Sequence, residues 1–417
     1  MMKCLLVVAV SAVFAGCSCA PTSSDDAGGD ATVEEVDAGL DAGPIPADAG
    51  FDAGEPPMDA GPADDGGCVG GFTRGTRWST GRPLFLELAD LDENGSPDIV
   101  AATTSGLEVR INDGQGGFAV PSRMLGGTPQ TLTVTDLDAD GHLDLITIDI
   151  TGAYAVFFGN GDGTFNSAAI DAGQPFFVPV ETALRDLDGD GRAEFVTVDV
   201  GGSSPELKVL RGAFDGGTRV SNGSHRLVLA DVTGDGLTDA LVGIAQYGLA
   251  LHPGQSDGGF AAPSVFLAST SVNSVALADV TGDGVPDAVC ATGYFDATAG
   301  FNLGGGLVVL RGTATDAGFS APPLEPMGRD IFGALVLTDL NVDGALDVVT
   351  TRFGSNGGLE VHAGGDAGLF TRVSSVPMGS GWAIATGALN GDTWPDVVVG
   401  TGAGSNGEVR VLLGGCQ

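Results

Sequence analysis

Acidic residues recur in this chain at a spacing that could bind a metal ion. Six nine-residue segments carry Asp at position 1, Asp, Asn or Thr at position 3, Asp or Asn at position 5, Gly at position 6 and an acid at position 9. Calcium prefers roughly six to eight oxygen ligands, which carboxylates and backbone carbonyls supply. A tight loop can direct side chains 1, 3 and 5 inward, add the carbonyl of position 7 and close with the carboxylate of position 9, while Gly permits the sharp turn. The spacing therefore predicts calcium-binding loops.

An alternative interpretation of these segments needs no metal. Asp and Asn side chains also accept hydrogen bonds from nearby backbone N–H groups, which produces Asp-rich β-turns. A single segment would fit that description. Six segments with one common spacing favour calcium, because clustered carboxylates repel one another unless a cation lies between them.

The elements that must position these loops are the short apolar segments on either side of them. In the first unit, residues 83–89 lead in, 98–103 follow the loop, 107–111 form a third segment and a fourth starts near Phe118. A Phe follows a Gly-rich turn again at Phe165, Phe260, Phe319 and Phe370. The seven copies start at Asp90, Asp136, Asp186, Asp231, Asp279, Asp339 and, in degraded form, Ala388. Four short strands per unit of about 50 residues predict an all-β fold, a seven-bladed β-propeller of four-stranded blades over residues 68–417.

The ends of this domain predict how the ring closes. The last unit ends after its third strand, at residues 407–413, whereas residues 70–79 begin like a fourth strand. The N-terminal strand is therefore expected to complete the last blade. That arrangement brings Cys68 next to Cys416, and an exported protein would allow a disulfide between them. Two unpaired cysteines are the alternative, and Cys290, within a strand, is expected to be a small buried residue.

The nine-residue strand–loop–strand repeat resembles the FG-GAP and VCBS repeats, including those of integrin α-subunit propellers. The resemblance covers about residues 70–416 and includes the stretch Val398–Gly402. It differs from an EF-hand, whose loop has a terminal Glu at position 12 and lies between helices. The resemblance implies a propeller with one calcium loop in each blade.

Carried over residue by residue, the resemblance implies four side-chain ligands in each of six loops. These are Asp90, Asp92, Asn94 and Asp98; Asp136, Asp138, Asp140 and Asp144; Asp186, Asp188, Asp190 and Glu194; Asp231, Thr233, Asp235 and Asp239; Asp279, Thr281, Asp283 and Asp287; and Asp339, Asn341, Asp343 and Asp347. Thr at position 3 of the fourth and fifth loops is neutral and is expected to weaken binding. The seventh loop keeps Asn390, Asp392 and Asp396 but has Ala388 at position 1 and Thr393 in place of Gly, so it is expected to be empty or weak.

The N-terminus predicts export. Residues 1–16 read as a signal peptide, with Lys3 followed by a short apolar run from Leu5 to Phe14. Residues 14–17 resemble a bacterial lipobox, which implies that Cys17 becomes the lipidated first residue of an outer-membrane lipoprotein facing the periplasm or the exterior. An ordinary cleaved signal peptide is the alternative. Residues 17–67 are expected to be a disordered tether, since residues 20–67 hold thirteen acids and no Lys or Arg.

Composition and side-chain distribution limit the function. A formal charge of −37 excludes nonspecific nucleic-acid binding, which needs a basic surface. The four histidines, at positions 142, 225, 252 and 362, fall in different blades and have no evident nucleophile beside them, so no catalytic site is expected. We therefore expect a calcium-stabilised, non-catalytic monomer that acts as a binding, adhesion or scaffold module for a protein or glycan at the cell surface.

Two other functions stay open at this stage. One is a carbohydrate-binding lectin, whose ligand patch could lie at Trp78, Trp382 and Trp394, all near the seventh blade, or on the fifth-blade insertion from Thr292 to Gly306. The alternative is that Trp78 and Trp382 pack the closure seam and that Trp394 fills space in the seventh loop. The other function, less favoured, is an accessory domain of a polysaccharide-active enzyme.

Overall fold

The alternation of short apolar segments with Gly- and Asp-rich turns produces seven separate antiparallel sheets in the computed structural model. The structure describes residues 68–69, 71–118, 123–125, 129–149, 153–170, 179–199, 206–210, 226–244, 247–296, 301–313, 318–320, 332–353, 357–365, 368–403 and 405–415. These ranges contain no α-helix, and hence no helix that could span a bilayer. The all-β prediction is confirmed.

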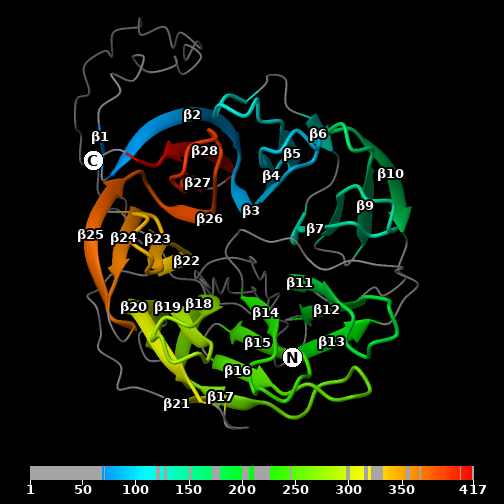
Figure 1. Ribbon diagram of the computed structural model, residues 1–417, viewed down its shortest axis with the longest axis vertical. Coiled ribbons are helices and arrows are strands. Elements are labelled where there is room, and N and C mark those ends of the chain that lie inside the picture. The colour runs from blue at the N-terminus through cyan, green and yellow to red at the C-terminus, as the bar shows by residue number, and fades with distance from the viewer. Residues whose placement is uncertain are drawn as a thin grey trace, which may run out of the picture. The chain divides into compact units, whose positions relative to one another are not determined.

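The sheets are the seven blades of a β-propeller, which confirms the predicted fold (Figure 1). Blade 1 contains β3 (Pro83–Ala89), β4 (Asp98–Thr103), β5 (Gly106–Arg110) and β6 (Arg123–Leu125); blade 2 contains β7 (Thr133–Thr135), β8 (Asp144–Ile148), β9 (Tyr154–Gly159) and β10 (Phe165–Ile170); and blade 3 contains β11 (Pro179–Arg185), β12 (Glu194–Asp199) and β13 (Glu206–Leu210). Blade 4 contains β14 (Leu227–Ala230), β15 (Asp239–Ile244), β16 (Gly248–His252) and β17 (Ser264–Phe266); and blade 5 contains β18 (Thr270–Ala278), β19 (Asp287–Asp296), β20 (Phe301–Gly312) and β21 (Phe319–Ser320). Blade 6 contains β22 (Phe332–Thr338), β23 (Asp347–Arg352), β24 (Gly358–Gly364) and β25 (Phe370–Pro377); and blade 7 contains β26 (Gly381–Gly387), β27 (Asp396–Ala403) and β28 (Asn406–Leu413), with β2 (Phe72–Gly81) and β1 (Cys68–Val69).

The first strand of each blade lies innermost. The strands β3, β26, β22, β18, β14, β11 and β7 each contact the next in that order. Each runs directly into the acidic loop of its own blade, and the second strand leaves that loop antiparallel to it, as Ala89 pairs with Asp98. Because all seven blades share this connectivity, the acidic loops lie on one face of the ring. The first strands begin at the opposite face.

Apolar packing between neighbouring blades holds the ring together. Seven clusters of buried side chains occur in the described residues, and each combines two adjacent blades. The cluster between blades 7 and 1, for example, contains Val409 and Ala385 of blade 7 with Leu86 and Ile99 of blade 1. Because every one of the seven seams has its own cluster, the ring is closed by burial at each junction.

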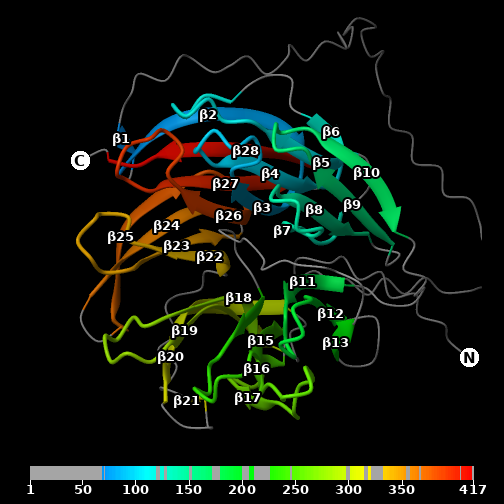
Figure 2. The ribbon, with the colours of Figure 1, turned by 45° about the vertical axis from the view of Figure 1, so that its right-hand side comes forward.

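The predicted closure of the last blade is confirmed. Strand β2 pairs antiparallel with β28, from Thr73 opposite Leu413 to Gly81 opposite Asn406. Figure 2 shows β2, β28, β27 and β26 lying in that order across the blade. Strand β1 adds a short fifth strand outside β2, with Cys68 opposite Thr73. Cys416 lies outside the described residues, so the predicted disulfide stays a prediction.

The outer strands differ in part from the sequence expectation. The fourth strand of blade 1 is predicted to start near Phe118; Phe118 makes an isolated bridge to Asn112, residues 119–122 lie outside the described residues, and β6 begins at Arg123. Phe260 likewise bridges Gly254 before β17. A proline follows each of these residues before the strand, and proline cannot donate to a β-ladder. The structure describes three strands in blade 3, and residues 211–225, where a fourth is expected, lie outside the described residues.

The fifth-blade insertion is mainly a longer hairpin rather than an irregular loop. Strands β19 and β20 continue their pairing past Thr292 opposite Gly306, as far as Asp296 opposite Phe301. Residues 297–300, which join the two strands, lie outside the described residues. The long spacing between the fifth and sixth loops therefore reflects strand extension.

Candidate metal centres

The acidic loops lie between the first and second strands of each blade; we number them loops 1 to 7 by blade. In loops 1, 2 and 3, oxygen atoms of the acids at positions 1, 3 and 9 all lie within 4.8 Å of one another, and these groups could hold a metal ion. They are Asp90, Asp92 and Asp98; Asp136, Asp138 and Asp144; and Asp186, Asp188 and Glu194. The structure therefore brings together three of the four side chains predicted for each of these loops, those at positions 1, 3 and 9.

Hydrogen bonds to the backbone shape every one of the six loops. In loop 1, the carboxylate of Asp90 accepts the N–H groups of Asn94 at 3.1 Å and Gly95 at 2.9 Å. The Asn94 side chain in turn accepts the N–H of Ser96 at 2.8 Å. Position 6 is glycine in all six loops and has φ between 85° and 95°, the left-handed region that disfavours other residues. These contacts are the Asp-rich turns of the metal-free interpretation, and they leave the remaining lone pairs available to a cation.

Position 9 has a second role that the sequence argument missed. In loop 1, Asp98 Oδ2 accepts the N–H of Leu91 at 2.8 Å, and Oδ1 accepts the N–H of Asn112, beyond the third strand, at 2.7 Å. The same pair of bonds recurs in loop 7, where Asp396 accepts from Leu389 at 2.7 Å and from Gly414 at 2.8 Å. The acid at position 9 therefore ties the loop to the third strand of its blade.

Glycine at the end of the third strand makes this tie possible. A Cβ on Gly159, Gly312 or Gly364 would lie 2.2–2.3 Å from the carbonyl oxygen of position 8 of the loop. The N–H groups of these glycines donate to the position-9 carboxylate. A glycine at the end of the third strand is visible in the sequence of most units. Its role in the tie to position 9 was not predictable, because the glycine and the loop are distant in sequence.

Electrostatics within the loops favours a cation. Burial, the largest cause, raises the pKa of Asp98 to about 7, and the charges of Asp92 and Asp90 raise it further against the backbone hydrogen bonds that lower it. Burial likewise raises the pKa of Asp144 and Asp347. A carboxylate that resists ionisation beside other acids would be stabilised by a positive charge at the centre of the loop.

Loops 4 and 5 provide an independent test of whether their residues fit a cation. The hydroxyl oxygens of Thr233 and Thr281, at position 3, are enclosed and have no hydrogen-bond partner among the described residues. A buried hydroxyl without a partner costs free energy. A cation in the loop would give each hydroxyl oxygen an electrostatic partner, so the donor set fits an oxygen-preferring ion.

Loop 7 differs in shape from the other loops, while its expected weak binding of calcium stays a prediction. Ala388 provides no oxygen at position 1, and Thr393 at position 6 is not in the left-handed region that the other loops adopt there. The Asn390 side chain instead donates to Asp392 at 2.9 Å. Trp394 lies against Gly415, since a Cβ there would meet its ring at 2.7 Å. Loop 7 keeps the position-9 tie without the ligands of positions 1 and 3.

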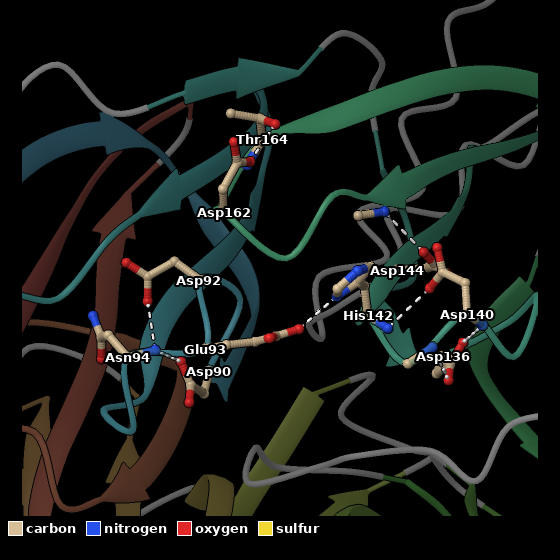
Figure 3. A network of polar contacts seen from close by, with 12 residues as sticks. Asp90, Asp92, Glu93, Asn94, Asp136, Asp140, His142, Asp144, Asp162 and Thr164 are labelled. Atoms are coloured by element: carbon tan, nitrogen blue, oxygen red, sulfur yellow. Dashed lines mark hydrogen bonds and ion pairs between the residues drawn. The ribbon is translucent and has the colours of Figure 1, made fainter.

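Neighbouring loops also contact one another across the seams. Figure 3 shows loops 1 and 2 side by side, with Glu93 of loop 1 joined to His142 of loop 2 through Oε1 and Nδ1. This hydrogen bond is the largest cause that raises the pKa of His142. The N–H of Gly163 in blade 2 donates to the carbonyl of Leu91 in loop 1 at 3.0 Å. The loops are therefore part of the contact between blades.

The other residues singled out from the sequence are dispersed. His252 is half-buried at the end of β16, and burial lowers its pKa. His362 is buried beside Glu360, and its Nε2 lies 3.2 Å from the Glu360 carboxylate. Cys290 is buried and unpaired among the described residues. His225 and Cys17 lie outside the described residues.

The tryptophans pack the seams of blade 7, as the sequence alternative proposed. Trp78 lies 6.1 Å from the Phe118 ring and beneath the guanidinium of Arg110. Trp382 lies 5.0 Å from the Phe353 ring of blade 6. Both therefore lie between blade 7 and a neighbouring blade.

Comparison with known proteins identifies the repeat. The FG-GAP-like repeat model matches residues 90–147, 136–197 and 231–290, and each match begins at position 1 of an acidic loop. No curated protein matches the chain. Among solved structures, a lectin from Burkholderia pseudomallei is 14% identical with a TM-score of 0.53, over 80% of this chain and 98% of that chain. BBS1N, solved in complex with ARL6DN, is 11% identical with a TM-score of 0.50, over 83% and 98%. An Agrocybe aegerita lectin that recognises non-reducing terminal N-acetylglucosamine is 20% identical with a TM-score of 0.44, over 71% and 81%.

Seven antiparallel sheets around one axis, each with an acidic loop between its first two strands, define a β-propeller with candidate metal loops. The chain contains FG-GAP-like repeats within a seven-bladed β-propeller. At these identities the likeness to solved structures concerns the fold alone. This fold is generally a binding or scaffold fold, although propellers can also be enzymes.

Proposed function

We propose that this protein is a calcium-stabilised, non-catalytic binding or scaffold module, in which calcium in loops 1 to 6 keeps the blades in register. Calcium is the ion that best suits clustered carboxylate, amide and carbonyl oxygens, and extracellular modules bind it with dissociation constants of about 10⁻⁴–10⁻³ M. When bound, calcium would neutralise the acids at positions 1, 3, 5 and 9. Its role would be structural, as the loops also build the seams.

The observation that supports this proposal is the packing of the side chain at position 2 of each acidic loop. In every loop, the apolar side chain at position 2 packs in the cluster between its own blade and the next. These side chains are Leu91, Leu137, Leu187, Val232, Val280, Leu340 and Leu389. The carboxylate at position 9 accepts the backbone N–H of the same residue, so an ordered loop and a closed seam support each other.

The test is a thermal unfolding experiment on the purified protein with calcium and with excess chelator. A ligand that binds only the native state stabilises it by about 2.7 kcal/mol at a concentration one hundred times its dissociation constant. We expect a melting temperature several degrees lower in chelator, restored by calcium and less well by magnesium, which prefers octahedral geometry. An unchanged melting temperature would contradict the proposal.

We further propose that the propeller is exported and lipid-anchored through Cys17, as a monomer at the outer membrane, facing the periplasm or the exterior. The support is the sequence of residues 1–17, with its charged start, apolar run and lipobox-like end. Metabolic labelling with a fatty acid, in the native protein and in Cys17→Ser, would test it. Equal labelling of both proteins would exclude lipidation at Cys17.

A further inference from the structure

Three side chains from three blades meet on the face opposite the acidic loops. Arg82 precedes β3, Trp382 lies at the start of β26, and Phe353 follows β23, so each lies at the strand end away from its loop. The Trp382 and Phe353 ring centroids are 5.0 Å apart, and Arg82 Cζ lies 4.6 Å from the Trp382 ring centroid. Because β3 and β26 are innermost strands, this cluster lies near the axis of the ring.

The arginine in this cluster is held in place from both sides. Its backbone N–H donates to Thr104 Oγ1 at 2.9 Å and to the Ser405 carbonyl at 3.2 Å, and its own carbonyl accepts the N–H of Thr104 at 3.0 Å. The Trp382 indole N–H donates to the Gly402 carbonyl at 2.8 Å, which fixes the ring beneath the guanidinium. Stacking on an aromatic face orients a guanidinium before any ligand arrives.

The Arg82 guanidinium has no carboxylate partner among the described residues. Other arginines of these three blades do have one: Arg110 pairs with Glu108 at 2.7 Å, Arg352 with Glu360 at 2.7 Å and Arg410 with Glu408 at 2.8 Å. Arg82 Nε is enclosed and makes no hydrogen bond within the described part of the chain. An enclosed donor without an acceptor reduces stability. The chain contains 54 acidic residues, yet none among the described residues pairs with Arg82.

A guanidinium offers only donors, in a planar fork that matches a carboxylate. Hydroxyl and amide side chains flank it at the tips of two hairpins, where Ser105, Ser405 and Asn406 are exposed. Such groups suit the hydroxyls of a sugar ring. The net charge of −37 would repel a ligand with many negative charges. In physiological salt, charges more than about 8 Å away are largely screened, so a ligand with one acidic group would interact mainly with the Arg82 guanidinium.

We infer that Arg82, Trp382 and the flanking hairpin tips bind a sugar that carries a single carboxylate, such as a terminal uronic acid. This inference rests on the proposed function as a binding module and gives its ligand class. The carboxylate lies against the exposed end of the Arg82 guanidinium, and the ring hydroxyls meet the hairpin side chains. The Trp382 ring orients the arginine and acts as a positioning residue.

The test uses the full-length protein in calcium and measures binding of methyl glucuronide and methyl galacturonide by calorimetry or ligand-observed NMR. The matched neutral sugars are the corresponding methyl glucoside and galactoside. We expect one of the uronides to bind at least about tenfold more tightly than its neutral partner, since hydrogen bonds to charged groups have that effect. Equal binding of acidic and neutral sugars would overturn the inference.

Variants then separate the site from the rest of the surface. Arg82→Gln should abolish the preference for the uronide, and Arg82→Lys should reduce it, because lysine keeps the charge but lacks the planar fork. The control is Arg77→Gln, which removes an exposed arginine of β2 in blade 7 that lies 4.0 Å from Glu408. Loss of binding in Arg77→Gln as well, with each variant melting like the native protein, would point to general charge attraction and overturn the site.

Three further outcomes distinguish the ligand class from the proposed function. If N-acetylglutamate binds as tightly as the uronides, the site recognises acidic peptides and the sugar assignment is wrong. If no uronide binds while chelator still lowers the melting temperature, this inference fails and the proposed calcium-stabilised module stands. If chelator also has no effect, the proposed function fails independently.

Discussion

Asp396 Oδ2 accepts the backbone N–H of Leu389 at 2.7 Å, in the one acidic loop that begins with alanine. Its other oxygen accepts the N–H of Gly414 at 2.8 Å. Asp396 is fully buried, and Leu389 packs in the seam between blades 7 and 1. Because Ala388 provides no oxygen at position 1, we expect loop 7 to separate the structural role of position 9 from any role in binding metal.

This separation gives the first prediction. Asp396→Asn should lower the free energy of unfolding by about 1–3 kcal/mol, because one buried N–H group would face an amide donor instead of an oxygen. The loss should be the same with calcium and with chelator, as measured by urea unfolding. Asp392→Asn is the control, since that side chain is exposed and asparagine can still accept from Trp394. A loss that disappears in chelator would mean that loop 7 binds metal.

Position 1 of an intact loop should behave in the opposite way. Asp136→Asn removes a carboxylate from the loop 2 triad, and we expect one fewer calcium ion per protein by calorimetric titration. The melting temperature should fall in calcium but change little in chelator. Asp392→Asn, in loop 7, should leave the calcium stoichiometry unchanged. If Asp136→Asn retains the full stoichiometry, loop 2 is an Asp-rich turn without metal.

The raised pKa of Asp98 predicts an unusual dependence of stability on pH. Its pKa is about 7 in the metal-free native state, mainly because of burial, against about 4 for Asp in an unfolded chain. The native state therefore takes up a proton between these values that the unfolded chain does not, so acidification from pH 7 towards pH 5 should raise the melting temperature in chelator. In saturating calcium, protons compete with the ion and this rise should be absent. A melting temperature that falls on acidification in chelator would contradict the assignment.

The glycine that ends the third strand is open to a direct test. In Gly364→Ala, the new Cβ would lie 2.2 Å from the carbonyl oxygen of Leu346, so the strand or the loop must shift. We expect a loss of about 1–3 kcal/mol by urea unfolding, typical of overpacking. Gly365→Ala is the matched control, because its Cβ would meet only the Leu369 carbonyl oxygen at 3.3 Å. Similar losses in both variants would exclude the close approach as the cause.

The cysteines of the closure seam carry the last prediction. Cys68 lies opposite Thr73, which pairs on its other side with Leu413, three residues before Cys416. We expect a disulfide between Cys68 and Cys416 in the exported protein, with a stabilisation of up to about 5 kcal/mol from restriction of the unfolded chain. Under denaturing, non-reducing conditions, Cys68→Ser and Cys416→Ser should each expose one additional reactive thiol. No additional thiol in either variant would show that the two cysteines are not paired with each other.

The sequence predicted the strands nearest loop 1 almost to the residue. Expected segments 83–89 and 98–103 coincide with β3 and β4, and expected segment 107–111 is β5, one residue earlier. This accuracy reflects the turn-forming Asp and Gly residues, because they mark where each strand ends. The outer strands were less predictable, since their edges have few buried contacts and prolines shift where pairing begins.

The candidate sites show the same division. The spacing of the acids predicted which side chains converge in loops 1 to 3. It did not predict that position 9 ties the loop to the third strand, or that position 2 enters the seam, because both depend on contacts with distant segments. The Arg82 cluster was also not predictable, since it unites residues of three blades that lie far apart along the chain.

The pairing of β2 with β28 has a consequence for how the chain folds. These strands are among the first and the last of the domain, more than three hundred residues apart, and a contact of that separation is slow to form. During synthesis, β2 must wait with unpaired edges until the other blades exist, and an unpaired edge is a site for pairing with other chains. A chain that stops before β28 would therefore lose more than one strand: it would leave β2 and β27 of blade 7 each with an unpaired edge and be prone to aggregate.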